Sequence, residues 1–521
     1  MKIYLFNTVV LGVLFLFLIQ TGCKKDKLSF DPSANFYVAD SAFLHALIDE
    51  GIDINGDGSI SFEEAEAVKT LNVDNKKISY LAGIEMFTNL DTLLCRSNNL
   101  TDLDLSGNIK IKYVDCANND IPHLDVSKNA NLEFLSCYNN LLYEIDITRN
   151  IKLTDFYCSG NHISELDLSK NTSLKNLGCG SNYLSSLDIT QNKDLEFLNC
   201  SNNSLTMIDC SNNKYLYALI IDENKISELN ISSNSKMEYL SCNNNQLHAL
   251  DVSGNTDLDH VYCEGNNLTE LNVTNNTNLT DLICNNNSIS VLDVSKNPLL
   301  RLFYCRNNNL TSLDLSSNPV LTHLDLSGNR TGELDLSSNN NLWYVGCDSC
   351  GLVNFDLSRN PLLEYIYCRG NLLTDLDLSV NLQLLGIKCA DNKLSSLDLT
   401  KNKGLQSLEC ERNSLSSLIL TDNSELLILN CEDNILQDLD LSGLKSLNIL
   451  YCGNNQLTDL DLSKNTLIGE TGYYYYYYDL KINDMPTLEQ VCVWTVPFPP
   501  SGLKMDRTGS PNVFFTTDCG I

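Results

Sequence analysis

A period of 21 residues runs through most of this chain and limits what it can fold into. Counted from Cys95 in steps of 21 residues, eighteen copies follow one another without an inserted or deleted residue. Cysteine stands at this position in sixteen copies, and Ile221 and Leu326 stand there in the other two. The later cysteines are Cys116, Cys137, Cys158, Cys179, Cys200, Cys242, Cys263, Cys284, Cys305, Cys347, Cys368, Cys389, Cys410, Cys431 and Cys452. A fixed period of this size indicates a solenoid of stacked coils.

Each copy repeats the same apolar positions, which in the first copy are Leu90, Leu93, Cys95, Leu100, Leu103 and Leu105. One coil cannot bury these side chains alone, but a stack of coils can. Asn occupies the position of Asn98 in 17 of 18 copies, with Cys350 as the exception. Because an Asn side chain carries both a donor and an acceptor, we expect it to satisfy backbone groups where the chain bends away from a strand.

The first half of each copy, L-x-x-L-x-C-x-x-N-x-L, resembles the highly repeated segment of leucine-rich repeats, with Cys in place of the third Leu. The second half, from Leu100 to Asn108 in the first copy, is again L-x-x-L-x-L-x-x-N. Nested halves of this kind are similar to a 21-residue bacterial class called IRREKO leucine-rich repeats. The resemblance covers roughly Leu71 to Asn465. It implies a leucine-rich repeat solenoid with parallel β-strands on one face of the coils and few helices.

We expect this solenoid, residues 71–465, to carry a cap at each end. A small helical cap resembling an EF-hand precedes it at residues 39–70. After Asn465 the period breaks, and residues 466–521 contain the tyrosine run from Tyr473 to Tyr478 and several prolines. This last segment predicts an irregular or β C-terminal cap that covers the open edge of the last coil.

The N-terminus has the pattern of a secretory signal, with Lys2 followed by a long apolar run. Cys23 directly after Thr21 and Gly22 resembles a bacterial lipobox, which implies a signal peptide at residues 1–22, lipidation of Cys23 and a tether at residues 23–38. The alternative is an uncleaved membrane anchor. The resemblance favours a lipid-anchored protein of the outer membrane, at the cell surface.

A loop before the solenoid has the residue types of an EF-hand calcium loop, with Gly58 at its sixth position. Calcium prefers about seven hard oxygen ligands. The predicted ligands are Asp53, Asn55, Asp57, Ser59, Ser61 and Glu64. Helical patterns flank the loop at residues 41–50 and 63–71. Because calcium sensors usually pair two such loops and this chain has one, we expect a structural calcium site rather than a signalling one; an empty loop is the third alternative.

The cysteines allow three interpretations, namely a metal site, disulfides between coils, or buried free thiols. A single file of thiols does not converge on one metal ion, and side chains in register point the same way, which disfavours disulfides. Ile221, Leu326 and Cys210 show that apolar residues and Cys interchange, so we expect free thiols. Cys492 and Cys519 lie outside the ladder, and we predict a disulfide between them in an oxidising envelope.

Tyrosines gather at the strand positions that should alternate outward beside the cysteine lane. We predict that they form a binding face for a protein or a glycan, although aromatic residues also suit strands in general. The residues chosen are Tyr157, Tyr262, Tyr304, Tyr344, Tyr365, Tyr367 and Tyr451.

A second file lies in the other half of each copy, where Asp stands at the position of Asp104 in 15 of 18 copies and Ser or Thr follows two residues later in all 18. We expect a solvated, hydrogen-bonded structural file. A calcium-binding strip or a surface for cationic ligands are the alternatives.

Composition excludes some functions. The formal net charge of -31 disfavours nucleic acid as a partner, because phosphates need a basic surface. The six histidines have no repeated catalytic partners, so we expect no enzyme activity. We therefore predict a cell-envelope lipoprotein whose solenoid binds protein or glycan ligands. The repeats resemble those of internalins, and this resemblance implies adhesion or host-surface contact. The alternatives are a structural spacer without a ligand, and an envelope enzyme or inhibitor subunit.

Overall fold

The computed structural model describes residues 31–470 and 477–519. The expected signal peptide, Cys23 and most of the tyrosine run lie outside these residues. Within them, no helix has the length and apolar character needed to cross a membrane.

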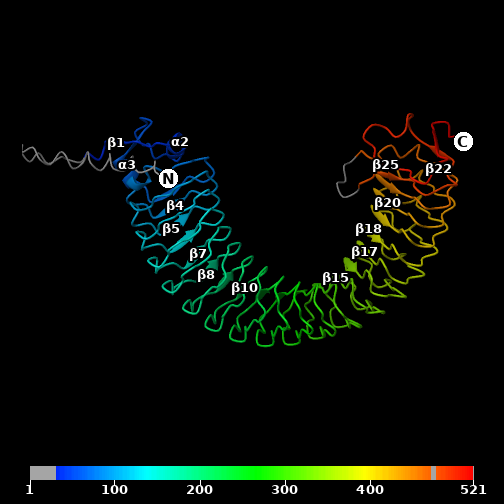
Figure 1. The fold of residues 1–521 in the computed structure, drawn as a ribbon, viewed down its shortest axis with the longest axis horizontal. Coiled ribbons are helices and arrows are strands. Elements are labelled where there is room, and N and C mark those ends of the chain that lie inside the picture. Colours follow the sequence, from blue (N-terminus) through cyan, green and yellow to red (C-terminus); the bar gives the residue numbers. More distant parts are fainter. Residues whose placement is uncertain (1–30, 471–476, 520–521) are drawn as a thin grey trace, which may run out of the picture.

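The molecule is a horseshoe built from one long parallel sheet (Figure 1). Each strand pairs with the next strand of this sheet along the chain, and within the repeats that strand lies one repeat later; Tyr365, for example, lies opposite Gly386. The strands follow the inner side of the curve (Figure 1), which we call the concave face. They are β3 (Thr70–Asn72), β4 (Thr92–Leu94), β5 (Tyr113–Asp115), β6 (Phe134–Ser136), β7 (Asp155–Tyr157), β8 (Asn176–Gly178), β9 (Phe197–Asn199), β10 (Ala218–Ile220), β11 (Tyr239–Ser241), β12 (His260–Tyr262), β13 (Asp281–Ile283), β14 (Leu302–Tyr304), β15 (His323–Asp325), β16 (Tyr344–Gly346), β17 (Tyr365–Tyr367), β18 (Gly386–Lys388), β19 (Ser407–Glu409), β20 (Ile428–Asn430), β21 (Ile449–Tyr451), β23 (Leu480–Lys481) and β25 (Met505–Asp506). The expected solenoid of parallel strands is therefore confirmed.

The core lies between this sheet and the other half of each coil. The middle residue of each strand and the cysteine after the strand point inward and are buried. All sixteen ladder cysteines, together with Cys210 and Cys350, are buried free thiols. Burial disfavours the thiolate and raises the pKa of Cys116 and of Cys158 to about 12. These thiols act as small apolar side chains, as expected.

The first asparagine lane joins neighbouring coils by hydrogen bonds. The Nδ2 of Asn182 donates to the carbonyl oxygens of Cys158 and Cys179, at 3.0 and 3.1 Å, and its Oδ1 accepts from the amide of Ile163 at 3.0 Å. In one coil Cys350 replaces Asn, so that a thiol stands in place of the side-chain amide. This thiol lies 3.3 Å from the Leu326 carbonyl oxygen. The predicted role of this lane is confirmed.

The second lane, on the other side of the coil, repeats only the donor half of this pattern, because its buried Oδ1 atoms, such as that of Asn171, have no hydrogen-bond donor among the described residues. The Nδ2 of Asn171 donates to the carbonyl oxygens of Ile147 and Asn150, at 2.9 and 3.0 Å.

The N-terminal cap contains α2 (Ser41–Asp49) and α3 (Phe62–Ala67), followed by the 3-10 helix η1 (Ile84–Met86). Asp40 caps α2 through Oδ1, while its Oδ2 accepts from the amides of Ser79 and Tyr80 and so attaches the helix to the first coil.

Two predicted boundaries of this cap differ from the structure. The second helix ends at Ala67 rather than near residue 71, because residues 70–72 pair with β4 as the first strand of the sheet. Residues 35–36, expected within the tether, form β1 (Asn35–Phe36), which pairs antiparallel with β2 (Ile60–Ser61).

The predicted irregular or β C-terminal cap consists of two further coils of irregular length. Their strands β23 and β25 extend the main sheet. On the other side of the coil, β22 (Asp459–Asp461), β24 (Gln490–Cys492) and β26 (Phe514–Thr516) form a second parallel sheet. Buried Leu480, Ile482 and Val491 continue the core, so apolar packing persists although the period of 21 residues does not.

Candidate functional site

The first and third residues of each strand point towards the concave face, together with residues that flank the strand, and most of them are half-buried or buried. Four of the seven predicted tyrosines come together here with two further aromatic residues, on strands β14 to β17. We call this set the aromatic patch: Tyr304, His323, Trp343, Tyr344, Tyr365 and Tyr367.

The rings of the aromatic patch form one connected network. The ring centroid of Tyr344 lies 6.3 Å from that of Tyr304 and 5.3 Å from that of Tyr367. His323 joins this group to Trp343, because its ring lies 6.4 Å from Tyr344 and 4.9 Å from Trp343. Trp343 in turn contacts Tyr365 at 5.6 Å. Such edge-to-face and tilted contacts are favourable for aromatic rings.

A buried carboxylate fixes the centre of the patch. The hydroxyl of Tyr344 donates to Oδ2 of Asp325 at 2.9 Å, and the guanidinium of Arg306 lies 3.7 Å from the same oxygen. Gly346 makes room for this carboxylate, since a Cβ there would lie 2.6 Å from the Asp325 carboxyl carbon. Burial and the neighbouring Asp325 raise the pKa of Tyr344, so its hydroxyl remains protonated and can donate. The centre of the patch is therefore held rigid before any ligand arrives.

The edges of the patch are polar and charged. The ammonium group of Lys388 lies 4.8 Å from the centroid of the Tyr367 ring. Burial lowers the pKa of the His323 imidazole, which favours its neutral form at pH 7. The patch thus has an aromatic centre with a polar rim.

The other three predicted tyrosines lie elsewhere. Tyr157 packs on Phe134 at 5.8 Å, and Tyr262 packs on Tyr239 at 5.5 Å. Tyr451 is only 6% exposed, because Lys481 covers its ring at 4.2 Å. All seven were expected to be exposed, but six are half-buried and Tyr451 is buried, since side chains on neighbouring strands stand close enough to shield one another.

Trp343 and His323 were not among the predicted residues of the face. Trp343 stands four residues before the cysteine, a lane that alternation alone does not assign to the face, yet it is 39% exposed. His323 stands in the same lane as Tyr344, and that lane was the signal that could have found it.

The file of aspartates in the other half of the coil is satisfied within its own turn. Oδ1 of Asp146 accepts from the amide of Thr148 at 2.9 Å and from its hydroxyl at 2.6 Å. These hydrogen bonds lower the pKa of Asp146, and the same pattern lowers that of Asp167. The expected hydrogen-bonded structural file is what the structure contains.

The residues predicted for calcium lie in one loop between α2 and β2. Asp53 accepts from the amides of Gly56, Asp57 and Gly58, and both glycines have the positive φ that such a loop requires. Asn55 accepts from the amide of Asp57.

Glu64 closes the loop from the first turn of α3. It accepts from the amides of Ile54 and Asn55 and from the amide and hydroxyl of Ser61. Burial alone would raise the pKa of Glu64, but these hydrogen bonds outweigh it and lower the pKa.

The donor set of this loop, with the carbonyl of Ser59, consists of hard oxygens that fit calcium in kind. In the structure the carboxylates bond to loop amides, and Asp53, Asp57 and Glu64 are not drawn together at one point.

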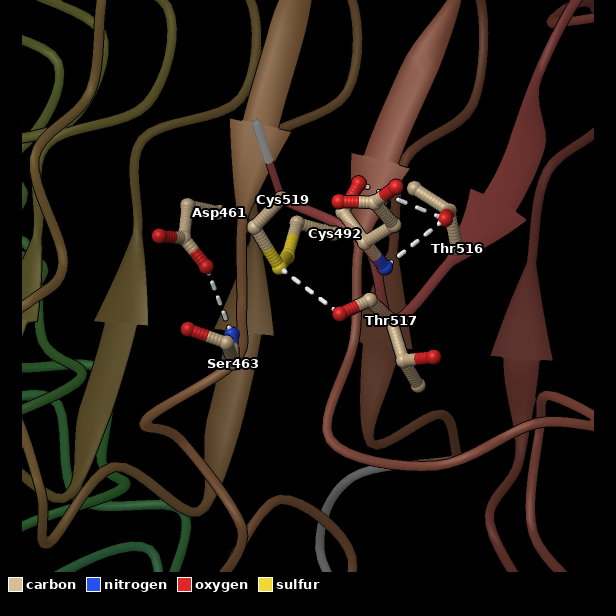
Figure 2. Close-up of a disulfide and its surroundings, with 7 residues drawn as sticks. Asp461, Ser463, Cys492, Thr516, Thr517 and Cys519 are labelled. Atoms are coloured by element: carbon tan, nitrogen blue, oxygen red, sulfur yellow. Dashed lines mark hydrogen bonds between the residues drawn. A yellow bond between two sulfur atoms is a disulfide. The ribbon is translucent and has the colours of Figure 1, made fainter. Parts of the chain in front are cut away.

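At the C-terminal end, Cys492 of β24 and Cys519 form a disulfide with a Cα–Cα distance of 5.5 Å (Figure 2). Asp461 lies beside it, and its Oδ1 accepts from the amide of Ser463 at 2.8 Å. Because the two sulfurs are joined, this group is a covalent clamp on the last coils rather than a set of metal ligands.

Comparison with known proteins identifies the architecture. No family model matches the chain, and no curated protein matches it. Among solved structures, the functional domain of InlJ from Listeria monocytogenes, which includes a cysteine ladder, is 30% identical. The match covers 71% of this chain and 72% of that one, with a TM-score of 0.52.

Two other solved structures share the fold at lower identity. YopM from Yersinia enterocolitica is 24% identical, with a TM-score of 0.62 over 86% of this chain and 91% of that one. The plant peptide hormone receptor RGFR1, in complex with RGF2, is 18% identical, with a TM-score of 0.68 over 88% of each chain. The identity and coverage of InlJ, together with the shared ladder, show that the chain belongs to the internalin-type leucine-rich repeat proteins with a cysteine ladder.

Proposed function

We propose that this protein is a cell-envelope lipoprotein whose concave face binds a protein ligand, anchored by the aromatic patch. The observation that carries the proposal is the connected network of six aromatic side chains on four adjacent strands. Aromatic residues with polar tips dominate the binding energy of protein interfaces, particularly where they are rigid before binding.

The similarity to receptors adds support. RGFR1 shares the solenoid and was solved in complex with RGF2. A curved sheet offers an extended surface rather than an enclosed pocket, which suits a macromolecular ligand.

The test is an array of proteins and glycans probed with the purified protein. Trp343→Ala with Tyr365→Ala should weaken binding to the captured protein ligand at least 30-fold, because each interface anchor contributes about 2 kcal/mol. The matched control is Tyr143→Ala with Tyr183→Ala, two tyrosines that are 67% and 62% exposed outside the patch; it should leave binding unchanged.

Three results would contradict the proposal. Equal loss in both variants would show that the patch has no special role. A blank array from folded protein would favour a structural spacer, and capture of glycans alone would replace the protein ligand.

The loop at residues 53–64 would hold calcium through Asp53, Asn55, Asp57, the Ser59 carbonyl, Ser61 and Glu64. Bound calcium would stiffen the attachment of α2 and α3 to the first coil. The melting temperature should fall in chelator, and Asp53→Ala with Glu64→Ala should abolish this difference. An identical melting temperature with and without calcium would contradict calcium binding at this loop.

Attachment to the outer membrane would occur through acylated Cys23. Labelling of cells with a fatty-acid analogue should mark the protein, and Cys23→Ser should abolish the label. Labelling that persists in Cys23→Ser would contradict the anchor.

A further inference from the structure

The charges of the concave face are unevenly balanced. Six carboxylates lie on the four coils of β10 to β13, just before the aromatic patch along the chain. We call this set the acidic stretch: Asp222, Glu223, Glu238, Asp259, Glu264 and Asp281. They stand directly before the strands, within them, or two to three residues after them.

Several acidic side chains elsewhere on this face have basic partners. Arg96 lies 3.6 Å from Asp115, Lys388 lies 3.2 Å from Glu409, and Lys481 lies 3.3 Å from Glu432. The first two pairs join neighbouring coils, and the third reaches across the coil of β21. Basic side chains therefore offset several acids on both sides of the acidic stretch.

Within the acidic stretch this compensation is nearly absent. Among the described residues, Arg301 is the one Arg or Lys within 4 Å of any of the six carboxylates, and it lies 3.8 Å from Asp281 at the edge. His260 lies between Asp259 and Asp281, with nitrogen–oxygen distances of 2.5 and 3.3 Å. The other four carboxylates have no cationic partner in the described part of the chain.

Neutral hydrogen bonds hold several of these carboxylates in place. Glu264 accepts from the side-chain amides of Asn285 and Asn286, at 3.1 and 3.0 Å. Asp222 accepts from the hydroxyl of Ser241 and the amide of Asn243. Burial still raises the pKa of Asp222, so these hydrogen bonds do not fully replace its lost hydration. A cation from outside would supply the missing stabilisation.

Tyrosine rings lie among the carboxylates. Tyr217 is 41% exposed, and Tyr239 and Tyr262 are half-buried with ring centroids 5.5 Å apart. Aromatic faces attract ammonium and guanidinium groups, and they also pack on the methylene stems of Lys and Arg. Carboxylates beside tyrosines thus fit long basic side chains better than small ions.

The arrangement also disfavours one bound metal ion. No three carboxylates of the acidic stretch converge within 4.8 Å of one another in the described residues. Instead they are spread over four coils that are about 4.8 Å apart. Several separate cationic groups on one extended segment match this spacing.

We propose that the protein ligand of the concave face carries a segment with several Lys or Arg side chains, which docks on the acidic stretch while an adjoining part of the ligand covers the aromatic patch. The inference rests on the proposed function, because it names the chemistry of that ligand. It assigns the basic segment to β10–β13 and the apolar contact to β14–β17.

The test uses a 12-residue peptide of alternating Lys and Ser as the probe, with alternating Glu and Ser as the negative probe. The variant is Glu223→Gln with Glu238→Gln and Glu264→Gln, in which each residue keeps its length and one acceptor oxygen. At low salt its Kd for the Lys peptide should rise about tenfold, since three exposed charge pairs are lost. The dependence of Kd on salt should also become shallower.

The matched control removes the same net charge from the outer file, as Asp209→Asn with Asp251→Asn and Asp293→Asn. Asn230 and Asn272 already occupy this file and accept the same hydrogen bond, so the control should fold normally. Its affinity for the Lys peptide should remain within twofold of the starting protein. Equal weakening in both triple variants would mean attraction by overall charge and would overturn the proposal.

Two further outcomes separate this inference from the proposed function. A protein ligand that depends on Trp343 and Tyr365 but not on Glu223, Glu238 and Glu264 would overturn the basic segment and leave the proposed function intact. Failure of the Lys peptide to bind at low salt would also overturn the basic segment.

Discussion

Two sets of carboxylates on opposite sides of the same coils behave differently. In the outer file, Asp146 and Asp167 accept hydrogen bonds from the residue two positions later, and their pKa values are lowered. On the concave face, burial raises the pKa of Asp115, Asp222 and Asp348. The folded protein therefore stabilises the ionised form of the outer carboxylates and destabilises the ionised form of these concave carboxylates.

The difference shows how carboxylates that stabilise the repeat can be distinguished from carboxylates that vary between coils. The outer file recurs in nearly every copy because each Asp closes its own turn and needs no partner. The concave acids vary from coil to coil and depend on neighbouring side chains. We therefore expect substitutions to distinguish the two sets clearly.

The largest expected effect is at Asp325. Asp325→Ala would leave the Tyr344 hydroxyl, the Ser327 amide and the Arg306 guanidinium without their shared acceptor. Loss of these partners at a buried carboxylate should cost about 2–3 kcal/mol, measured as a shift of the urea midpoint. Asp335→Ala in the outer file should shift the urea midpoint far less. Equal shifts in the two variants would contradict the difference between the two sets of carboxylates.

An intermediate effect, with opposite signs in the two sets, is expected from pH. Because the folded pKa of Asp222 is raised, the protein gains stability as pH falls through that value towards the unfolded value of 3.8. Asp222→Asn lacks this gain, so its melting temperature relative to the starting protein should be highest at pH 7 and should decline towards pH 3.8.

Asp167→Asn provides the opposite case. The folded pKa of Asp167 is lowered, so its contribution is present above 3.8 and is lost as pH falls through the folded value. The variant should be less stable at pH 7 by only about 1 °C, because Asn accepts the same hydrogen bond, and the difference should disappear in acid. The same sign for both variants would contradict the comparison.

The smallest effect is expected in the outer file near Asn272. Asp251→Asn reproduces a residue that the file already contains, and Asn272 accepts from Thr274 as Asp251 accepts from Ser253. The melting temperature at pH 7 should change by about 1 °C or less. A large decrease would mean that the ionised group has a role beyond its own turn.

The fold could be predicted well from the sequence because the same residue types recur at the same positions in many copies of the repeat. The inward places of Leu93, Cys95 and Asn98, and the hydrogen bonds of the outer file, follow from period and residue chemistry. The two coils after residue 465 could not be counted, because their lengths vary although their core positions remain apolar.

The site was predicted only in part. Alternation identified the lanes of Tyr344 and Tyr367, but it does not report which tyrosines touch one another. Trp343 lies outside those lanes, and Tyr451 is covered by Lys481 from a coil that the period did not reveal. Contacts between coils, rather than positions within a coil, define the aromatic patch.

The interruption of the asparagine lane at Cys350 has a mechanical consequence. In each of the remaining coils, the Asn of this lane joins the coil to its predecessor through a side-chain amide that both donates and accepts. The thiol of Cys350 offers only a weak donor. The coil of β16, which carries Tyr344, thus has a weaker side-chain link to its predecessor than the other coils of this lane. Pulled from its two ends, the protein should separate at this coil more readily than at the coils beside it, directly beneath the aromatic patch.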